Sequence, residues 1–320
     1  MRYLGRRLIH ATLLLIGVSC FSFALLQWAP GDFFDELQLN PRISAQTVEA
    51  LRVEYGLNQS LPVRYEHWLR SIAHGDLGFS LAYNSPVGPI IAVRARNTLV
   101  LTGAATLMAW LLAIPLGIWT ATSGRGWVNR ILGVTTSTLL TIPDLLLFLC
   151  LLLLAVRTGW FPAGGMFSPS AEGAAFWSRA KDLLTHLFLP AFGLAVVSLP
   201  VLIRHVRSAM IDVLASPFLR AARAHGIPRM RLLFRYALPV AANPLISLFG
   251  FSVATMLSAS LIAEVILSWP GLGPLLIEAT LARDVYVVVA TVLLSAVFLV
   301  FGNLLADLLL VAVDPRIRME

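Results

Sequence analysis

Residues 285–313 read VYVVVATVLLSAVFLVFGNLLADLLLVAV. This stretch contains a single charged side chain, Asp307. A transmembrane helix needs about 20 consecutive and mainly apolar residues, so this stretch is long enough to cross a bilayer. Burying an ionised carboxylate there is costly, and Asp307 is therefore a candidate intramembrane polar site.

The composition of the whole chain agrees with a membrane protein. Hydrophobic residues make up 58% of the 320 residues and charged residues 13%, against about 25% charged residues in a typical soluble domain. A soluble fold of this length cannot bury so much apolar surface. The basic residues, all Arg except Lys181, cluster beside apolar stretches, which favours a role in topology over nucleic-acid binding. We predict an all-α integral membrane protein that contacts membrane lipid and binds no nucleic acid.

Six transmembrane helices can be laid out by the length criterion. The expected spans are residues 9–28, 99–121, 131–156, 187–203, 242–266 and 285–313. Several contain prolines, which membrane helices tolerate when neighbouring groups satisfy the freed carbonyl oxygens. Asp144 in the third span and Glu264 in the fifth join Asp307 as possible intramembrane polar sites. A structural role, a substrate contact and a proton relay are all open for these three acids.

Basic residues set the expected orientation. With the N-terminus in the cytoplasm, the inside segments hold 14 Arg and three acidic residues, whereas the outside segments hold ten basic and eleven acidic residues. This asymmetry follows the positive-inside rule, so we expect both termini to be cytoplasmic. The expected inside segments are 1–8, 122–130, 204–240 and 314–320.

The predicted spans and loops divide the chain into four parts. The first part carries three Arg and then an apolar run that is too long for a signal-peptide core. This pattern predicts a retained signal-anchor helix. The parts are the anchor helix (1–28), an extracytoplasmic subdomain (29–98), a five-helix core (99–313) and a cytoplasmic tail (314–320).

The subdomain at 29–98 predicts two short helices. Ser44 is suited to cap a helix that runs to about Tyr55. Pro62 is suited to the start of a second helix, which ends before Gly75. The residues expected on the inner face of this second helix are Tyr65, Trp68, Leu69 and Ile72.

The longest expected cytoplasmic loop, 204–240, contains SPFLRAARAHGIPR at positions 216–229. Pro217 suits the first turn of a short helix, and Gly226 suits the left-handed position that ends it. Pro228 suits the start of a second helix, and Pro239 is expected to limit that helix. A slim helix flanked by arginines can lie in a groove of a partner protein, but a solvated loop whose arginines only set topology fits these residues equally well.

The loop resembles the signature of ABC-importer permeases, Glu-Ala-Ala-x3-Gly-x9-Ile-x-Leu-Pro. Arg220 and Tyr236 stand where the general signature has Glu and Ile, and Arg at the first position resembles the dipeptide/oligopeptide branch of the family. The residues at matching spacings are Ala221, Ala222, Gly226, Leu238 and Pro239.

Other segments resemble the same branch, in the same order along nearly the whole chain. Asp144 departs from it, because a small polar residue is usual after the preceding proline. The matching segments are Pro30-Gly31-Asp32, Tyr55-Gly56-Leu57, Gly75-Asp76-Leu77-Gly78-x-Ser80, Ser268-Trp269-Pro270-Gly271-Leu272-Gly273 and Asp314-Pro315-Arg316-Ile317-Arg318.

The resemblance implies a type I ABC importer permease in a bacterial plasma (inner) membrane, importing peptides or related solutes such as glutathione, nickel chelates or sugars. It also implies three kinds of partner: a second homologous permease, two cytoplasmic ATP-binding subunits that use ATP and Mg²⁺, and an extracytoplasmic substrate-binding protein. The residues that it assigns to the ATPase-coupling loop are Arg220, Ala221, Ala222, Arg223, Gly226, Leu238 and Pro239.

The chain has no Gly-x4-Gly-Lys-[Ser/Thr] phosphate-binding loop, so ATP must be bound by another subunit if it drives transport. We expect no catalytic residues, no cofactor and no metal in this chain, because its histidines and its two cysteines show no ligand spacing. A proton-coupled secondary transporter that works without an ATPase is the alternative, with the three intramembrane acids as its relay. An intramembrane enzyme is the third hypothesis, and no catalytic motif supports it.

Overall fold

The computed structural model describes residues 2–28, 46, 49, 53, 59–171 and 173–313. Several expected features lie outside these residues: the helix at 44–55, the motifs at 30–32 and 55–57, the tail at 314–320 and the side chain of Asp307. The chain forms two compact units. Unit 1 comprises Met1–Asn97 and Pro270–Val300, and unit 2 comprises Thr98–Trp269 and Phe301–Glu320.

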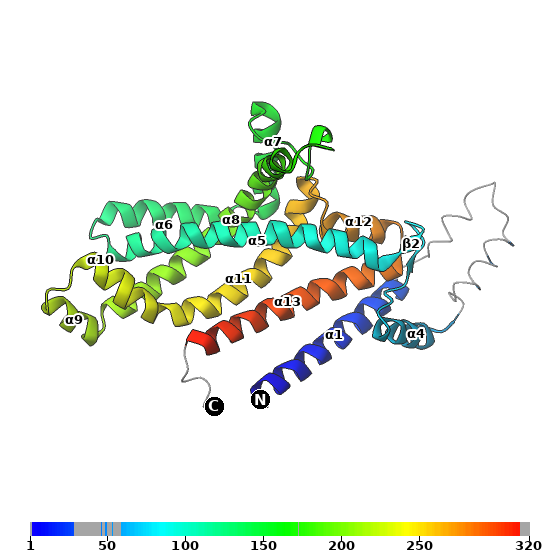
Figure 1. The fold of residues 1–320 in the computed structure, drawn as a ribbon, viewed down its shortest axis with the longest axis horizontal. Helices are drawn as coiled ribbons and strands as arrows, with labels where there is room; N and C mark the ends of the chain where they lie inside the picture. The colour runs from blue at the N-terminus through cyan, green and yellow to red at the C-terminus, as the bar shows by residue number, and fades with distance from the viewer. Residues whose placement is uncertain are drawn as a thin grey trace. The chain divides into compact units, whose positions relative to one another are not determined.

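Nearly all of the described secondary structure is helical (Figure 1). Unit 1 contains α1 (Arg2–Trp28), α4 (Leu61–Ala73), the strands β1 (Phe79–Ser80) and β2 (Ser85–Pro86), and α12 (Leu272–Leu281). Unit 2 contains α6 (Gly126–Thr141), α7 (Asp144–Thr158), the short η1 (Pro169–Ala171), α8 (Phe176–Leu214), α9 (Pro217–Ala224), α10 (Arg229–Arg231), the π-helical η2 (Leu232–Ala237) and α11 (Leu238–Ile266). Helices α5 (Val87–Thr122) and α13 (Val285–Val313) continue from one unit into the other.

Four helical stretches within the described residues are long and apolar enough to cross a bilayer: Val87–Thr122, Phe176–Leu214, Arg229–Ile266 and Val285–Leu305. The pair α6 and α7 makes a fifth if it counts as one span, and the apolar part of α1 is shorter, at Ile9–Leu25. The prediction of an all-α, multi-pass architecture is therefore confirmed. The number six is not confirmed.

The third expected span, 131–156, is interrupted by a bend of 100° between α6 and α7. Pro143 causes this break. It has no N–H to donate, and its ring pushes the preceding residue out of the helical region. Ile142 is accordingly extended, with φ −80° and ψ 121°, and Pro143 itself has ψ 136°. Asp144 then occupies the first turn of α7.

Other helices are longer than the sequence predicted. Helix α5 begins at Val87, well before the expected start near residue 99, and α8 extends beyond 187–203 at both ends. Pro190 and Pro200 lie inside α8 without ending it, as expected for prolines in helices that pack against neighbours.

Unit 1 has a larger buried cluster formed by α5, α12 and α13, and a smaller one where α1 meets α4. Phe23, Trp68 and Val289 are buried together, and the hydroxyls of Ser19 and Tyr65 lie 2.9 Å apart in a hydrogen bond. The prediction of an α4 helix with Trp68 on its inner face is confirmed, but Leu69 is 41% exposed, so its predicted inward orientation is wrong.

A buried carboxylate organises the hairpin of unit 1. Asp284 is 2% exposed and accepts hydrogen bonds from the Ser80 hydroxyl (2.6 Å) and the Ala82 N–H (3.2 Å). Its other oxygen accepts the Val287 N–H at the start of α13 (3.3 Å). A buried acid is tolerated when its oxygens are satisfied in this way.

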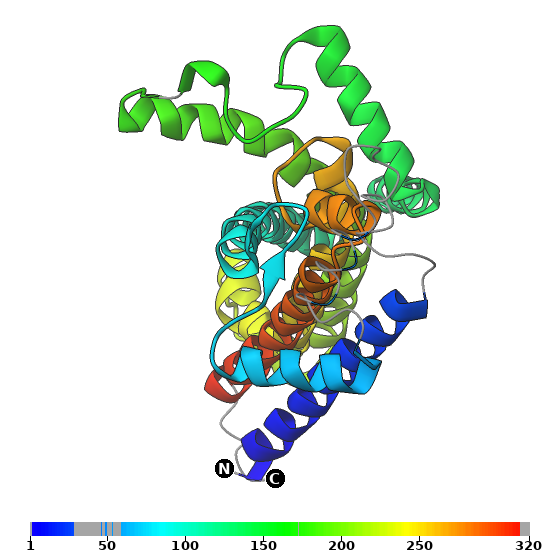
Figure 2. The same ribbon diagram turned by 90° about the vertical axis from the view of Figure 1, so that its right-hand side faces the viewer.

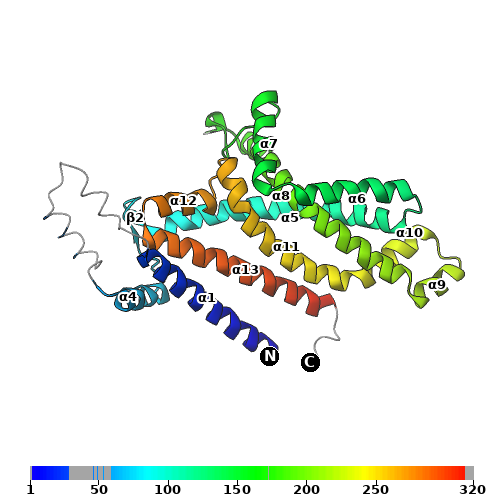
Figure 3. The same cartoon turned by 180° about the vertical axis from the view of Figure 1, so that it is seen from behind.

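Unit 2 is built on α8, which packs against α11, α7 and α6. Figure 3 shows α8 and α11 crossing, and Figure 2 shows α7 and the first turns of α8 projecting from the other helices of this unit. Two glycines permit close helix approach. A Cβ on Gly193 would lie 2.6 Å from Cε1 of Phe148, and one on Gly117 would lie 2.5 Å from Cγ1 of Val206.

Helix α11 ends in a turn in which the exposed Ser268 stands between the buried Leu267 and Trp269. The Trp269 N–H donates to the Glu264 carbonyl (2.8 Å) and the Ser268 N–H to the Val265 carbonyl (3.4 Å), the hydrogen-bond pattern of a Schellman motif. Ser268 has φ +51°, although it is not glycine. Gly164 packs on this turn so closely that a Cβ there would lie 2.9 Å from the Leu267 carbonyl oxygen.

Candidate functional site

Helix α9 is short, and its sequence explains both ends. Ser216 is extended, with φ −67° and ψ 148°, and Pro217 occupies the first helical position, where its missing N–H costs no hydrogen bond. Leu219 is 2% exposed and belongs to the core of unit 2, against which Ala222 and Ile227 also pack. Eight residues are too few for a stable isolated helix, so this packing stabilises α9.

The C-terminus of α9 is a Schellman motif. The Gly226 N–H donates to the Arg223 carbonyl (3.0 Å), and the Ile227 N–H donates to the Ala222 carbonyl (3.4 Å). Gly226 has φ +77°, as the sequence predicts, and no heavy atom lies within 4 Å of where its Cβ would be. A side chain at this position would therefore be opposed by backbone strain rather than by crowding.

The outer face of α9 is exposed and slim. Arg220, Ala221 and Arg223 are all exposed, and Phe218 is 45% exposed. Ala222 lies on the opposite side, half-buried against the core. The two alanines of the motif therefore differ in position: Ala221 can touch a partner, whereas Ala222 packs inside this chain.

Pro239 does not limit the second helix, so this prediction is wrong. Residues 229–266 form one continuous helical stretch, because the π-helical η2 precedes the proline. The Leu238 N–H reaches back five residues to the Leu233 carbonyl, and this wider turn leaves room for the proline ring. Leu238 packs on the core and Pro239 is exposed at the start of α11, so neither lies on α9.

The three candidate acids lie on three different helices. Asp144 is half-buried in the first turn of α7, where the helix dipole favours a negative charge. Glu264 is fully buried in α11. Asp307 lies in α13, and its side chain is outside the described part of the chain.

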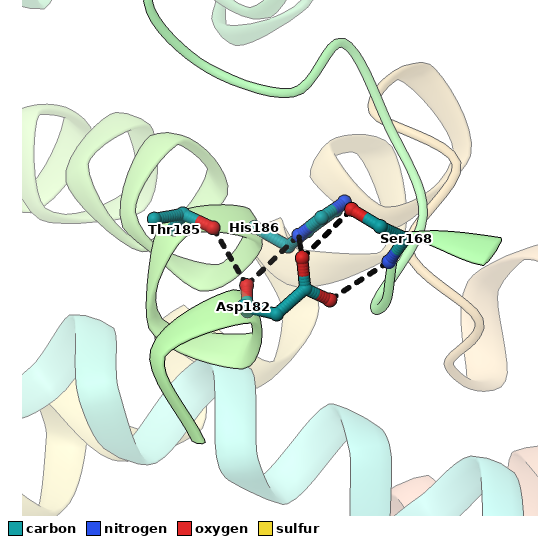
Figure 4. A network of polar contacts seen from close by, with 4 residues as sticks. All are labelled: Ser168, Asp182, Thr185 and His186. Carbon is teal, nitrogen blue, oxygen red and sulfur yellow. Dashed lines mark hydrogen bonds and ion pairs between the residues drawn. The ribbon is translucent and has the colours of Figure 1, made fainter. Parts of the chain in front are cut away.

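Sequence reasoning missed a polar cluster at the start of α8 (Figure 4). Asp182 accepts hydrogen bonds from the N–H (2.8 Å) and the hydroxyl (2.7 Å) of Ser168, and Nδ1 of His186 lies 3.6 Å from its carboxylate. Ser, His and Asp meet here, but the serine hydroxyl binds the carboxylate and not the imidazole. A nucleophilic relay needs the serine on the histidine, so this cluster instead holds the loop before α8 against the helix.

A second polar contact lies in unit 1, beyond the expected spans. The Tyr83 hydroxyl donates to Glu278 of α12. Partial burial and this hydrogen bond raise the pKa of Tyr83 to about 12, because both disfavour the phenolate. The contact joins the tip of the hairpin to α12, and no local sequence signal pairs residues this far apart.

These features define a class: a helical, multi-pass membrane protein whose surface carries a short and largely exposed helix. Residues 113–319 match the family described as "Binding-protein-dependent transport system inner membrane component", and residues 1–102 match its N-terminal region. The chain belongs to this family, which confirms the resemblance, and it is a transport permease subunit.

Named relatives match over the full length. The chain is 37% identical over 318 residues to "Oligopeptide transport system permease protein AppB" of Bacillus subtilis (strain 168), with 99% of each chain covered. It is 32% identical over 338 residues to "Dipeptide transport system permease protein DppB" of Escherichia coli (strain K12), again with 99% of each covered.

A solved structure agrees on the fold. The MetNI methionine ABC transporter, in inward-facing conformations, matches with a TM-score of 0.57 at 17% identity, covering 70% of this chain and 96% of that chain. The predicted ABC importer permease fold is therefore confirmed. The proton-coupled alternative gains no support from these comparisons.

Proposed function

We propose that this chain forms part of the translocation path of an ATP-driven peptide importer, and that α9 docks on a separate cytoplasmic ATPase. The exposed face of α9 carries the proposal: Arg220, Ala221 and Arg223 project outward from a helix that is fixed by Leu219. The names of the two relatives support a peptide substrate. Short helices with compact side chains allow close approach of a partner backbone, and the arginines suit an acidic rim.

The remaining partners follow from the family. A second homologous permease would complete the path, two ATP-binding subunits would use ATP and Mg²⁺, and a substrate-binding protein would deliver the solute from outside. This chain would bind no cofactor. Both termini would be cytoplasmic, which agrees with the excess of Arg in the segments 122–130 and 204–240.

The geometry suggests how ATP binding is transmitted. Helix α9 packs against α8 and η2, and η2 continues into α11. Leu219 and Ile227 join the docking helix to this core. If ATP binding draws two ATPase subunits together, α9 would follow, and α8 and α11 would move with it because packed interiors deform little.

The test is co-purification of the ATPase with tagged variants of this chain. Ala221→Glu places a bulky charge on the exposed face and should reduce the recovered ATPase about tenfold or more. Ala175→Glu is the matched control, since Ala175 is equally exposed but precedes α8. Full recovery of the ATPase with Ala221→Glu would contradict docking through α9.

Orientation is tested by labelling single cysteines in a background without Cys20 and Cys150, both of which are exposed. A membrane-impermeant maleimide should reach a cysteine at Ala221 only from the cytoplasmic side and one at Ala175 only from outside. The reverse result would overturn the proposed topology while leaving the family unaffected.

A further inference from the structure

A groove runs between the end of α5 and the stretch α10–η2, within unit 2. Its volume is about 470 Å³, which lies in the range of small-molecule sites of about 300–1,000 Å³. Seven of its nine lining residues are apolar, and the two polar ones are Thr122 and Arg229. The apolar lining residues are Ile114, Pro115, Ile118, Trp119, Met230, Leu233 and Phe234.

The walls of the groove are partly exposed. Trp119 is 50% exposed, Met230 65% and Phe234 52%. Exposed apolar walls of this kind suit contact with the acyl chains of a bilayer. The groove lies where the apolar helix α5 ends at Thr122, three residues before Arg125. Trp and Arg at such an end are typical of the membrane–water interface, where a lipid chain can reach the apolar walls.

The polar end of the groove is cationic. Nη2 of Arg229 donates to the Thr122 carbonyl oxygen (2.7 Å), which fixes the guanidinium over the end of α5. A guanidinium has five N–H donors, and among the described residues this carbonyl is the one acceptor that Arg229 binds. The adjoining segments 122–130 and 204–240 contain nine Arg and one acid, Asp212. The other N–H donors of Arg229 can bind a phosphate group, and the excess of Arg in these segments favours an anionic ligand.

We propose that this groove binds an anionic phospholipid of the cytoplasmic leaflet, with an acyl chain along α5 and its phosphate on Arg229. Basic pockets between transmembrane helices on the cytoplasmic side are suited to anionic headgroups. The choice of leaflet rests on the topology proposed above. Because α10 and η2 form one wall and η2 packs against α9, a bound lipid would also support the docking helix from behind.

The test is native mass spectrometry of the purified full-length chain in detergent, with added phosphatidylglycerol or with phosphatidylcholine of the same acyl chains. We expect retention of phosphatidylglycerol to exceed that of phosphatidylcholine about fivefold, since one arginine contributes about 1 kcal/mol to binding of an anionic lipid. Inorganic phosphate at millimolar concentration should not displace the lipid, because it lacks the acyl chain.

Two pairs of variants locate the site. Arg229→Glu should lower phosphatidylglycerol retention about tenfold, whereas Arg231→Glu, the same change at an exposed arginine outside the groove, should leave it within about twofold. Ile114→Trp should fill the groove and abolish retention. Leu111→Trp, about one turn earlier on α5 and 64% exposed, should not. If Arg229→Glu or Ile114→Trp does not give a monodisperse protein, Arg229→Gln is measured in its place.

Three results would overturn the proposal. Equal losses of phosphatidylglycerol retention with Arg229→Glu and Arg231→Glu would mean that general surface charge, and not this groove, holds the lipid. Equal retention of the two lipids that is insensitive to Ile114→Trp would mean no site. A photoreactive side chain at Met230 that cross-links a protein subunit instead of lipid would identify a protein occupant. Recovery of the ATPase, measured in the same preparations, reports separately on the proposed docking function.

Discussion

The turns that end α9 and α11 have the same hydrogen-bond pattern and opposite surroundings. At the end of α9, Gly226 takes φ +77° with open space around it. At the end of α11, Ser268 takes φ +51° beside the fully buried Trp269. A left-handed conformation costs an L-residue roughly 1–2 kcal/mol. The first turn avoids this cost through its residue type, and the second is held by its neighbours.

The largest effect is expected at Gly164, which packs against the turn that ends α11. Gly164→Ala would place a Cβ 2.9 Å from the Leu267 carbonyl oxygen and 3.1 Å from the Ser268 Cβ. Overpacking of this kind costs typically about 1–3 kcal/mol, so thermal unfolding in detergent should occur at a clearly lower temperature. Gly124→Ala is the matched loop control, since nothing lies within 4 Å of its Cβ position. Equal melting of the two variants would mean that Gly164 does not constrain the turn.

At the exposed turn, Gly226→Val should act through the backbone alone. We expect a loss of roughly 1–2 kcal/mol, confined to α9, with normal membrane insertion and strongly reduced recovery of the ATPase. Limited proteolysis of the segment 216–229 would report local opening of the helix. Unchanged co-purification and transport would count against both the strained turn and the docking role of α9.

Replacing Ser268 tests the turn that ends α11 from the other side. Ser268→Gly removes the conformational penalty but increases the entropy of the unfolded chain, so we expect a net stabilisation of about 0.5 kcal/mol and a small rise in melting temperature. A destabilised variant would show that the Ser268 side chain contributes packing that exceeds its strain.

The smallest effect is expected for Gly226→Asn. Asparagine tolerates the left-handed region better than other residues with a side chain, and the space around Gly226 is open. Stability should change by a few tenths of a kcal/mol at most, with the ATPase still recovered. A large loss of recovery with intact stability would mean that the partner itself packs against Gly226.

Local sequence rules predicted the turn that ends α9 but not the turn that ends α11. Pro217 and Gly226 each have a strong positional preference, so the bounds of α9 follow from nearby residues. Ser268 carries no such signal, because its conformation depends on Trp269 and on Gly164, far away in the chain. Residue type alone likewise could not separate Ala221 from Ala222, whose exposure depends on the core beneath α9.

Prolines were the main source of error in the predicted fold. The rule that a proline ends a helix holds at Pro143. It fails at Pro239, where the π-helical turn of η2 keeps the helix continuous. The hydrogen bond between Ser168 and Asp182 was also not predicted, because the loop and α8 come together only in the folded chain. The family motif predicted which residues form the coupling loop, and the structure was needed to show which of them are exposed.

The length of α8 has a consequence for coupling. Its 39 residues, at about 1.5 Å per residue, make a rod of roughly 58 Å, about twice the thickness of a hydrocarbon core. Near one end of α8, Asp182 binds the preceding loop, and the other end is Leu214, three residues before Pro217. If α9 docks on the ATPase as proposed, a movement of α9 would be passed to α8, which packs against it, and along α8 towards the opposite side of the membrane. We expect α8 to bend first at Pro190 and Pro200, because each proline removes a backbone hydrogen bond.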